Sequence, residues 1–105
     1  MIIEYTSEPF DEKDFKDHLS NTLVEFTSPT CAPCREQFRI LQELEKKTTG
    51  LEFIKVDATL ARDMISTYSL KKVPTLILFQ DGQPQARKEG LQSLEALETW
   101  LGDLI

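Results

Sequence analysis

The segment Thr30-Cys31-Ala32-Pro33-Cys34-Arg35 contains both cysteines of the 105-residue chain. It follows the apolar run Leu23-Val24-Glu25-Phe26, which predicts a strand, and it leads into a run from Arg35 to Lys47 with helical spacing of its apolar residues. Side chains three positions apart on a helical turn have Cβ atoms about 5–6 Å apart, and a disulfide requires Cα atoms roughly 4.4–6.8 Å apart. The pair can therefore form and break a disulfide without refolding of the chain.

The two cysteines are expected to differ in reactivity. Cys31 falls at the N-terminus of the predicted helix, where unpaired backbone N–H groups and the positive end of the helix dipole favour a thiolate. We therefore predict that Cys31 is the nucleophile and that Cys34, one turn further on and less exposed, resolves the mixed disulfide. Arg35 leaves two interpretations open: a solvated helix residue, or a charge that favours the Cys31 thiolate.

Composition and charge exclude several classes of function. The 18 acidic and 12 basic residues give a net charge of −6 and are spread along the chain. This argues against nucleic acid as a partner, because phosphate binding depends on clustered Lys and Arg. The acidic balance predicts a solvated surface, with at most weak steering of a basic partner. The length predicts a single domain over residues 1–105.

Cysteine usage and hydropathy predict the compartment. Two cysteines are too few for a disulfide-dense secreted domain, and a single C-x-x-C motif close to a β-α-β pattern is typical of cytosolic redox chemistry. The sequence begins Met-Ile-Ile-Glu, without a basic stretch, and no apolar run reaches the roughly 20 residues of a membrane span. We expect a soluble cytoplasmic protein that does not bind a membrane.

Periodicity along the chain predicts alternating strands and helices, followed by a hairpin and a final helix. Alternation of this kind favours the α/β class, with a central mixed β-sheet of about five strands and helices on both faces. Asp81-Gly82 predicts a hairpin turn, so the strands on either side of it should be antiparallel. The expected strands are Ile2–Tyr5, Thr22–Thr27, Leu51–Val56, Thr75–Phe79 and Gln85–Lys88, and the expected helices are Phe10–Leu19, Arg35–Lys47, Leu60–Tyr68 and Leu94–Leu104.

This order of elements resembles the thioredoxin family over nearly the whole chain. The resemblance depends on Cys31-Ala32-Pro33-Cys34 at the first core strand-to-helix junction, Val73-Pro74-Thr75 before the hairpin, the Phe79-Gln80-Asp81-Gly82 turn, and Gly90 after the last strand. It implies the thioredoxin fold and an enzyme, a thiol–disulfide oxidoreductase that reduces protein disulfides and carries electrons in cell redox homeostasis. The redox-active Cys31–Cys34 disulfide would be the working group, without a further cofactor or a metal. The resemblance also implies a thioredoxin-reductase-type electron donor, and we expect a monomer.

The resemblance further implies a substrate groove around the cysteines. In the family, the proline that matches Pro74 is cis and packs beside the disulfide. This would leave the Val73 backbone free to pair with an extended substrate peptide. The other residues expected to contact substrate are Thr30, Ala32, Pro33 and Gly90.

Some residues near the cysteines depart from the family pattern. Ala32 stands where the family usually has glycine, and Thr27 and Thr30 stand where it usually has tryptophan. Because Ala32 precedes a proline, we predict extended backbone there, with Ala32 as the cap and Pro33 at the start of the helix. Loss of an aromatic side chain at Thr30 should open or flatten one wall of the groove.

Glu25 and Lys55 each interrupt an apolar strand, where an unpaired charge is costly. The resemblance makes their strands neighbours, so the two side chains can pair. Glu25 also falls where the family usually has a buried aspartate that exchanges protons with the resolving cysteine. A raised carboxyl pKa there would suit general acid–base chemistry near neutral pH. The alternative is that the two residues only pair with each other or extend to the surface.

Two other functions are consistent with the sequence. One is a thioredoxin-fold binding module whose main role is to hold a partner, with redox activity secondary, and the altered groove at Thr27 and Thr30 supports it. The other is metal binding by the two thiolates. Two ligands are fewer than the four of a structural zinc site, so a site shared between two copies would be required.

Overall fold

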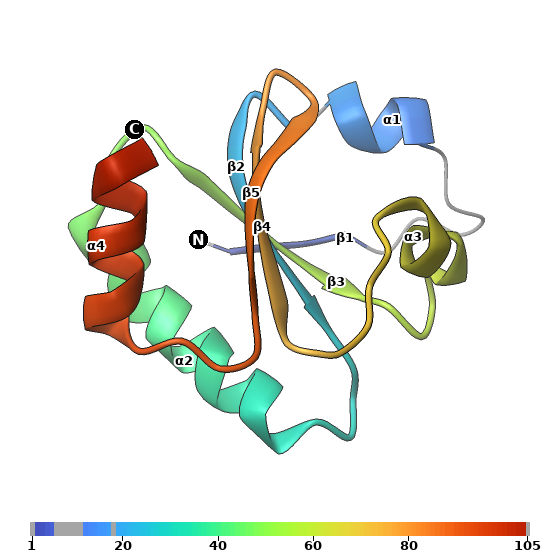
Figure 1. The fold of residues 1–105 in the computed structure, drawn as a ribbon, viewed down its shortest axis with the longest axis horizontal. Coiled ribbons are helices and arrows are strands. Elements are labelled where there is room, and N and C mark those ends of the chain that lie inside the picture. Colours follow the sequence, from blue (N-terminus) through green and yellow to red (C-terminus); the bar gives the residue numbers. More distant parts are fainter. Residues whose placement is uncertain (1, 6–11, 18, 105) are drawn as a thin grey trace.

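The computed structural model describes residues 2–5, 12–17 and 19–104 of the chain. Strands and helices alternate as far as the third helix, and a hairpin and a final helix follow (Figure 1). The strands are β1 (Ile3–Tyr5), β2 (Asn21–Thr27), β3 (Glu52–Asp57), β4 (Thr75–Gln80) and β5 (Gln83–Glu89), and the helices are α1 (Glu12–Asp17), α2 (Ala32–Lys47), α3 (Arg62–Thr67) and α4 (Leu94–Leu104).

The strands form one mixed sheet in the order β1-β3-β2-β4-β5. β3 is parallel to both β1 and β2, whereas β4 is antiparallel to both β2 and β5. The central strand β2 has a neighbour on each side and helices over both faces, which explains why six of its seven residues are buried. The predicted α/β class and mixed sheet are confirmed.

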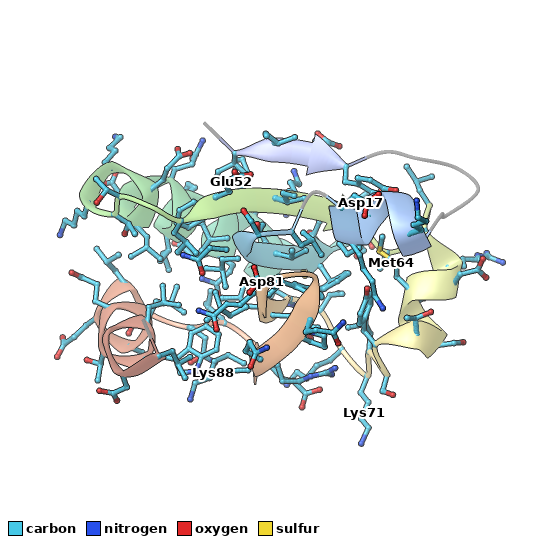
Figure 2. The ribbon with its side chains drawn as sticks, turned by 90° about the horizontal axis from the view of Figure 1, so that it is seen from above. Asp17, Glu52, Met64, Lys71, Asp81 and Lys88 are labelled. Atoms are coloured by element: carbon cyan, nitrogen blue, oxygen red, sulfur yellow. A yellow bond between two sulfur atoms is a disulfide. The ribbon has the colours of Figure 1, made fainter. Side chains whose placement is uncertain are left out.

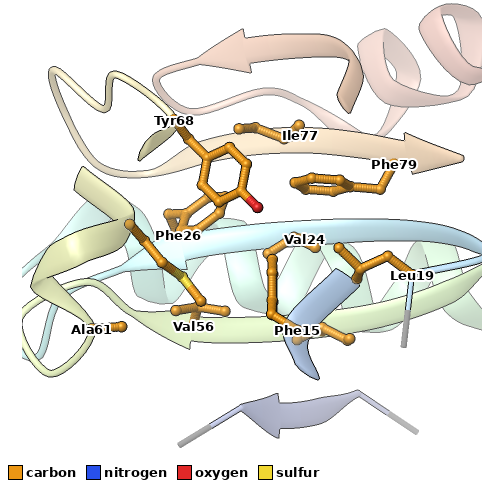
Figure 3. Close-up of a cluster of buried hydrophobic side chains, with 11 residues drawn as sticks. Phe15, Leu19, Val24, Phe26, Val56, Ala61, Tyr68, Ile77 and Phe79 are labelled. Atoms are coloured by element: carbon orange, nitrogen blue, oxygen red, sulfur yellow. The ribbon is translucent and has the colours of Figure 1, made fainter. Parts of the chain in front are cut away.

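A hydrophobic core lies on each face of the sheet, because successive side chains of a strand point to opposite faces. Figures 1 and 2 show α2 and α4 on one side of the sheet and α1 and α3 on the other. The core beneath α1 and α3, shown in Figure 3, consists of Phe15, Leu19, Val24, Phe26, Ile54, Val56, Ala61, Met64, Tyr68, Ile77 and Phe79. The core beneath α2 and α4 consists of Leu23, Leu41, Leu44, Leu51, Phe53, Leu76, Leu78, Leu97 and Leu101.

Two helices are shorter than their apolar spacing predicts. Helix α3 begins at Arg62 and not at Leu60, because the Asp57 carboxylate accepts hydrogen bonds from the Thr59 N–H (2.9 Å) and hydroxyl (2.6 Å). This side-chain turn holds the chain out of helical geometry. Helix α1 spans Glu12–Asp17 within its predicted range of 10–19, of which positions 10, 11 and 18 lie outside the described residues.

The hairpin between β4 and β5 has the predicted turn at Asp81-Gly82. Both residues have positive φ, 53° and 79°, which is the geometry of the tight turn that joins twisted antiparallel strands. The turn is also bonded to the start of β2, since the N–H groups of Asp81 and Gly82 donate to the carbonyls of Ser20 and Leu19, each at 2.7 Å. The hairpin is therefore fixed to the first half of the chain.

Two glycine substitutions should change stability in opposite directions. At Gly82, an alanine would be held at positive φ, so Gly82→Ala should lower the free energy of unfolding by about 1–2 kcal/mol. Gly102 lies in α4 with open space where a Cβ would be placed, so Gly102→Ala should raise it by roughly 0.5–1 kcal/mol. Urea unfolding at unchanged m-value measures both. Equal shifts of the midpoint in the two variants would contradict the turn geometry.

Candidate active site

Cys31 caps the N-terminus of α2. Its backbone is extended (φ −101°, ψ 105°), and its Sγ accepts a hydrogen bond from the Cys34 N–H at 3.1 Å. A backbone N–H aimed at this sulfur stabilises negative charge on it, as does the helix N-terminus itself. The predicted position of Cys31 at the start of the helix is therefore confirmed.

The predictions that Ala32 is the extended cap residue and that the helical run starts at Arg35 are wrong. Ala32 is the first helical residue, and Pro33 lies within the first turn. A residue before proline is biased toward extended backbone, but Ala32 is nevertheless helical. Pro33 is tolerated after it because the N–H groups of a first turn have no partner within the helix. A proline there costs no hydrogen bond, and the sulfur of Cys31 supplies the cap.

The two sulfurs form a disulfide, with the Cα atoms 5.2 Å apart. They are unequally accessible, since 9% of Cys31 is exposed and only 1% of Cys34. An attacking thiolate or a substrate disulfide arriving from solvent can therefore reach Cys31 and not Cys34. This difference agrees with the order of reactivity predicted from the sequence.

Loops from distant parts of the chain lie near the start of α2 at one end of the sheet (Figure 1). The Val73 carbonyl oxygen lies 3.8 Å from the Cys31 Sγ, and the Val73–Pro74 peptide bond is cis. The Gly90 N–H donates to the Pro74 carbonyl at 2.8 Å, which places the loop after β5 beside this segment. The predicted groove residues Thr30, Ala32, Pro33, Val73, Pro74 and Gly90 thus lie in the segments around Cys31.

Sequence reasoning missed Gln37, which is fully buried in α2. Its Nε2 donates to the Gln92 carbonyl at 3.1 Å, and its Oε1 accepts from the Gln92 N–H at 2.7 Å. The amide thus joins α2 to the loop that follows Gly90. The position of Gln37 in the sequence could have identified it, because it lies between Cys34 and Leu41 on the inward face of the helix, where a polar side chain needs a buried partner.

Two exposed leucines near the disulfide were also missed as groove residues. Leu60 follows the Asp57 turn and is 49% exposed, and Leu91 follows Gly90 and is 48% exposed. The Ala58 N–H donates to the Thr27 carbonyl at 2.9 Å, so the loop that carries Leu60 adjoins the end of β2. Apolar surface therefore lies in two of the loops around Cys31.

Glu25 is fully buried on β2, on the face covered by α2. Within the described residues, neither of its carboxylate oxygens has a hydrogen-bond partner. Burial raises the pKa of Glu25 from 4.5 to about 8, and the charge of Lys55 opposes part of this rise. Glu25 is therefore mostly protonated at neutral pH and titrates in the range where thiols do.

Lys55 is the direct neighbour of Glu25 across β2 and β3, as the resemblance implied. The predicted ion pair is nevertheless absent among the residues described. The Lys55 ammonium instead lies 4.6 Å from the centroid of the Phe38 ring on α2. A cation is attracted to the face of an aromatic ring, and in this place it remains half-exposed to water. Lys55 therefore acts on Glu25 through its field and not through a contact.

A cavity of about 510 Å³ adjoins Cys34 between α2 and the sheet. Its wall includes Thr27, whose side chain is much smaller than the tryptophan usual in the family, together with Phe38 and the charged Lys55 and Asp57. The cavity is wide enough to hold water next to the buried cysteine. Water can therefore lie beside Cys34 in this cavity.

Among the residues that the structure describes, no group of three His, Cys, Asp or Glu side chains is close enough to hold a metal ion. In the same residues, no helix is both long enough and apolar enough to cross a membrane.

A cysteine pair that caps the first helix after a central strand, on a fold of this kind, defines a thiol–disulfide oxidoreductase. The family model for thioredoxin matches residues 2–103. The chain is 33% identical to thioredoxin C-2 of Corynebacterium nephridii over 85% of this chain and 82% of that protein. It is 28% identical to a thioredoxin of Rickettsia bellii over the full length of both. The chain belongs to the thioredoxin family.

A solved structure has the same fold. A mutant thioredoxin from Halobacterium salinarum NRC-1 superposes with a TM-score of 0.83. The match covers 97% of this chain and 88% of the other at 24% sequence identity. The predicted thioredoxin fold is therefore confirmed.

The raised pKa of Glu25 predicts a pH-dependent stability. Between about pH 5 and pH 8, the folded protein keeps a proton on Glu25 that the unfolded chain releases. The free energy of unfolding should therefore fall as the pH rises through this window, by up to about 1.4 kcal/mol per pH unit. Glu25→Gln removes this term, so its stability relative to wild type should rise across the window and stay level below it.

Urea unfolding of the oxidised proteins at a series of pH values measures this difference. The oxidised form is used because cysteines in a disulfide do not titrate. The remaining titrating groups are shared by both proteins and cancel in the comparison. Parallel stability curves from pH 5 to pH 8 would show that Glu25 titrates normally.

Proposed function

We propose that the protein reduces disulfides in other proteins, with Cys31 as the nucleophile and Cys34 as the resolving thiol. The observation that carries the proposal is the cap of α2: a partly exposed sulfur that accepts a backbone N–H, with its partner sulfur buried one turn on. A thiolate in this position is stabilised, accessible and within reach of a second thiol.

The reaction balances in two exchanges. The Cys31 thiolate attacks one sulfur of the substrate disulfide, and the other substrate sulfur leaves as a thiolate. The Cys34 thiolate then attacks the Cys31 sulfur of the mixed disulfide, and the second substrate thiolate leaves. The substrate gains two electrons and the protein is left with the Cys31–Cys34 disulfide found in the structure.

The substrate would bind as an extended peptide over Cys31. Among the described residues, the Val73 N–H has no backbone hydrogen bond, and its carbonyl lies beside the Cys31 sulfur. These two groups can pair with a peptide backbone as a short added strand. The side chains of Leu60 and Leu91 supply apolar contacts on either side, with Thr30, Ala32 and Pro33 along the helix start.

Glu25 would accept the proton of Cys34 in the resolving step. Its pKa of about 8 is close to the roughly 8.5 of an ordinary thiol, so transfer between the two costs little free energy. Because Glu25 is mostly protonated at neutral pH, it must first lose its own proton, and Lys55, above Phe38, would stabilise the carboxylate that this loss forms. Water in the cavity beside Cys34 would then carry the proton to solvent.

The reaction requires a source of electrons to reopen the Cys31–Cys34 disulfide. We propose a thioredoxin-reductase-type donor and a cytoplasmic location, where thiol pools keep such pairs reduced. The protein would act as a monomer, because each step uses one cysteine pair and one groove. Other carriers of electrons are not needed for this cycle.

Replacement of each cysteine separately tests the assignment of roles. Cys34→Ser should accumulate a mixed disulfide between Cys31 and substrate, because the resolving thiolate is missing, whereas Cys31→Ser should lose essentially all turnover. Mass spectrometry under non-reducing conditions measures the adduct, and the insulin reduction rate measures turnover. Equal residual turnover in the two variants would overturn the assignment. Stable substrate capture by a double Cys→Ser variant, without turnover in wild type, would favour the binding module.

Glu25→Gln should slow the release of substrate from the mixed disulfide, by about tenfold to a hundredfold at pH 7, because the proton acceptor is lost. Glu25→Asp keeps a carboxyl group and is the matched control. Stopped-flow fluorescence of a labelled mixed disulfide, from pH 6 to pH 9, measures the rate. The wild-type profile should contain a step near pH 8 that Gln removes and Asp retains. Identical profiles for wild type and Gln would exclude Glu25 from proton transfer.

A further inference from the structure

Four loop segments surround the disulfide, and their contacts fix them together. Cys31 follows directly from the end of β2, whose Thr27 carbonyl accepts from the Ala58 N–H. The Val73 carbonyl touches the Cys31 sulfur, and the Pro74 carbonyl accepts from Gly90. The segments, which we call the active-site rim, are 28–35, 57–61, 70–75 and 90–93.

The charge of the active-site rim is opposite to that of the whole chain. The rim, all of which the structure describes, contains three cationic residues (Arg35, Lys71 and Lys72) and one acidic residue, Asp57. The three cations are exposed, whereas the Asp57 carboxylate is half-buried and bonded to Thr59. The chain as a whole has a net charge of −6. The exposed rim is therefore a cationic patch on an acidic protein.

The three cations are not engaged by acidic side chains within the described part of the chain. The ion pairs found there join Lys13 to Asp17, Arg39 to Glu36 and Lys46 to Glu43. Glu36, the acidic residue next to Arg35, pairs with Arg39 instead. The Arg39 Nη2 donates to both carboxylate oxygens of Glu36, at 2.5 Å and 2.7 Å. The charges of Arg35, Lys71 and Lys72 remain available to a partner.

The cations lie in two segments of the active-site rim. Lys71 and Lys72 directly precede Val73, and the Lys72 Nζ lies 3.4 Å from the point where a Cβ on Gly90 would be. Lys71 extends away from the ribbon in Figure 2. Arg35 lies in the first turns of α2, where its backbone N–H donates to the Cys31 carbonyl at 3.3 Å, and it lines a hollow together with Ala32, Pro33, Glu36 and Arg39. A peptide that pairs with Val73 over Cys31 would therefore lie in a rim that carries exposed cations in two of its segments.

We propose that this rim selects substrate disulfides flanked by acidic residues. The inference rests on the proposed function, because it names the substrate class of that site. Opposite charges across an interface raise the rate of productive encounter and lower it for partners of like charge. The net charge of the chain alone predicts the opposite preference, for a basic partner. The local field decides because charges beyond about 8–10 Å are largely screened at physiological salt.

Three disulfide peptides of equal length test the proposal, with Glu, Gln or Lys at the positions that flank each cysteine. The reduced protein is mixed with each peptide in the absence of any reductase, and the second-order rate of reduction is measured. Each rate is divided by that of dithiothreitol, whose reacting thiolate carries one negative charge as the Cys31 thiolate does, to remove differences in peptide reactivity. At 150 mM salt, where the screening length is about 8 Å and the local rim dominates, the Glu peptide should react about threefold faster than the Lys peptide. In 1 M salt, where the screening length is about 3 Å, the ratio should approach one.

Charge reversal shows whether the rim is responsible. Arg35→Glu/Lys72→Glu should reverse the order of the Glu and Lys peptides. The matched control, Lys46→Glu/Lys47→Glu, changes the net charge equally at the far end of α2, roughly 18 Å from Arg35. This control should keep the wild-type order. The ratio of two peptides on one variant does not depend on changes in the reactivity of Cys31, so an effect of Arg35 on the thiolate cancels.

The outcomes separate this inference from the proposed function. Reduction of the Gln peptide with equal rates for the Glu and Lys peptides would overturn the inference and leave the function in place. Equal shifts in the rim and control variants would overturn it as well, since net charge would then explain the preference. A wild-type protein that fails to reduce even the Gln peptide would overturn the function and, with it, the inference.

Discussion

The hydrogen bond from the Cys34 N–H to the Cys31 sulfur is the interaction on which the site depends. A helix needs an acceptor at its N-terminus, and here the reactive atom supplies it. The same geometry places the second cysteine one turn on, under the first, so that one sulfur is partly exposed and the other buried. The helix cap, the proposed nucleophile and the proposed resolving group are therefore one local structure. The surrounding loops act on a sulfur whose position α2 has already fixed.

Glu25 is an acidic residue buried in the core of the fold, where an ionised side chain is unfavourable. Strand β2 lies at the centre of the sheet with helices on both faces, so each of its side chains must be placed in a core. Because successive side chains of a strand point to opposite faces of the sheet, Glu25 points toward α2, the helix that carries the cysteines. The carboxyl group has no hydrogen-bond partner in the described residues, and it escapes the penalty of a buried charge by staying protonated. Lys55 stays near enough to influence its pKa and far enough to leave it unpaired, because the Phe38 ring holds the ammonium.

The elements and the cysteine pair were predictable from the sequence because each depends on neighbours in the chain. Apolar spacing gave α4 its observed bounds, and Asp81-Gly82 gave the hairpin its turn. What could not be predicted depends on contacts between distant segments. Gln37 is buried because Gln92 meets both ends of its amide, and Lys55 leaves Glu25 because Phe38 is one turn from Cys34. The start of α2 was predicted wrongly for a local reason. The N–H groups of a first turn have no helical partner, and this outweighs the general bias of pre-proline residues toward extended backbone.

Small side chains at Thr27 and Thr30 change how this protein can recognise a partner. Thr27 leaves open space beside Cys34, and Thr30 offers little surface for apolar contact. What remains around Cys31 is backbone at Val73, two leucines in separate loops, and exposed cations. Hydrogen bonds to a peptide backbone do not depend on the sequence of the peptide, and two leucines bury little apolar area. On the proposed binding mode, discrimination among disulfides would depend mainly on charge, which acts on the rate of encounter more than on the lifetime of the complex. Fast, weak association suits an enzyme that must release each substrate after a single exchange.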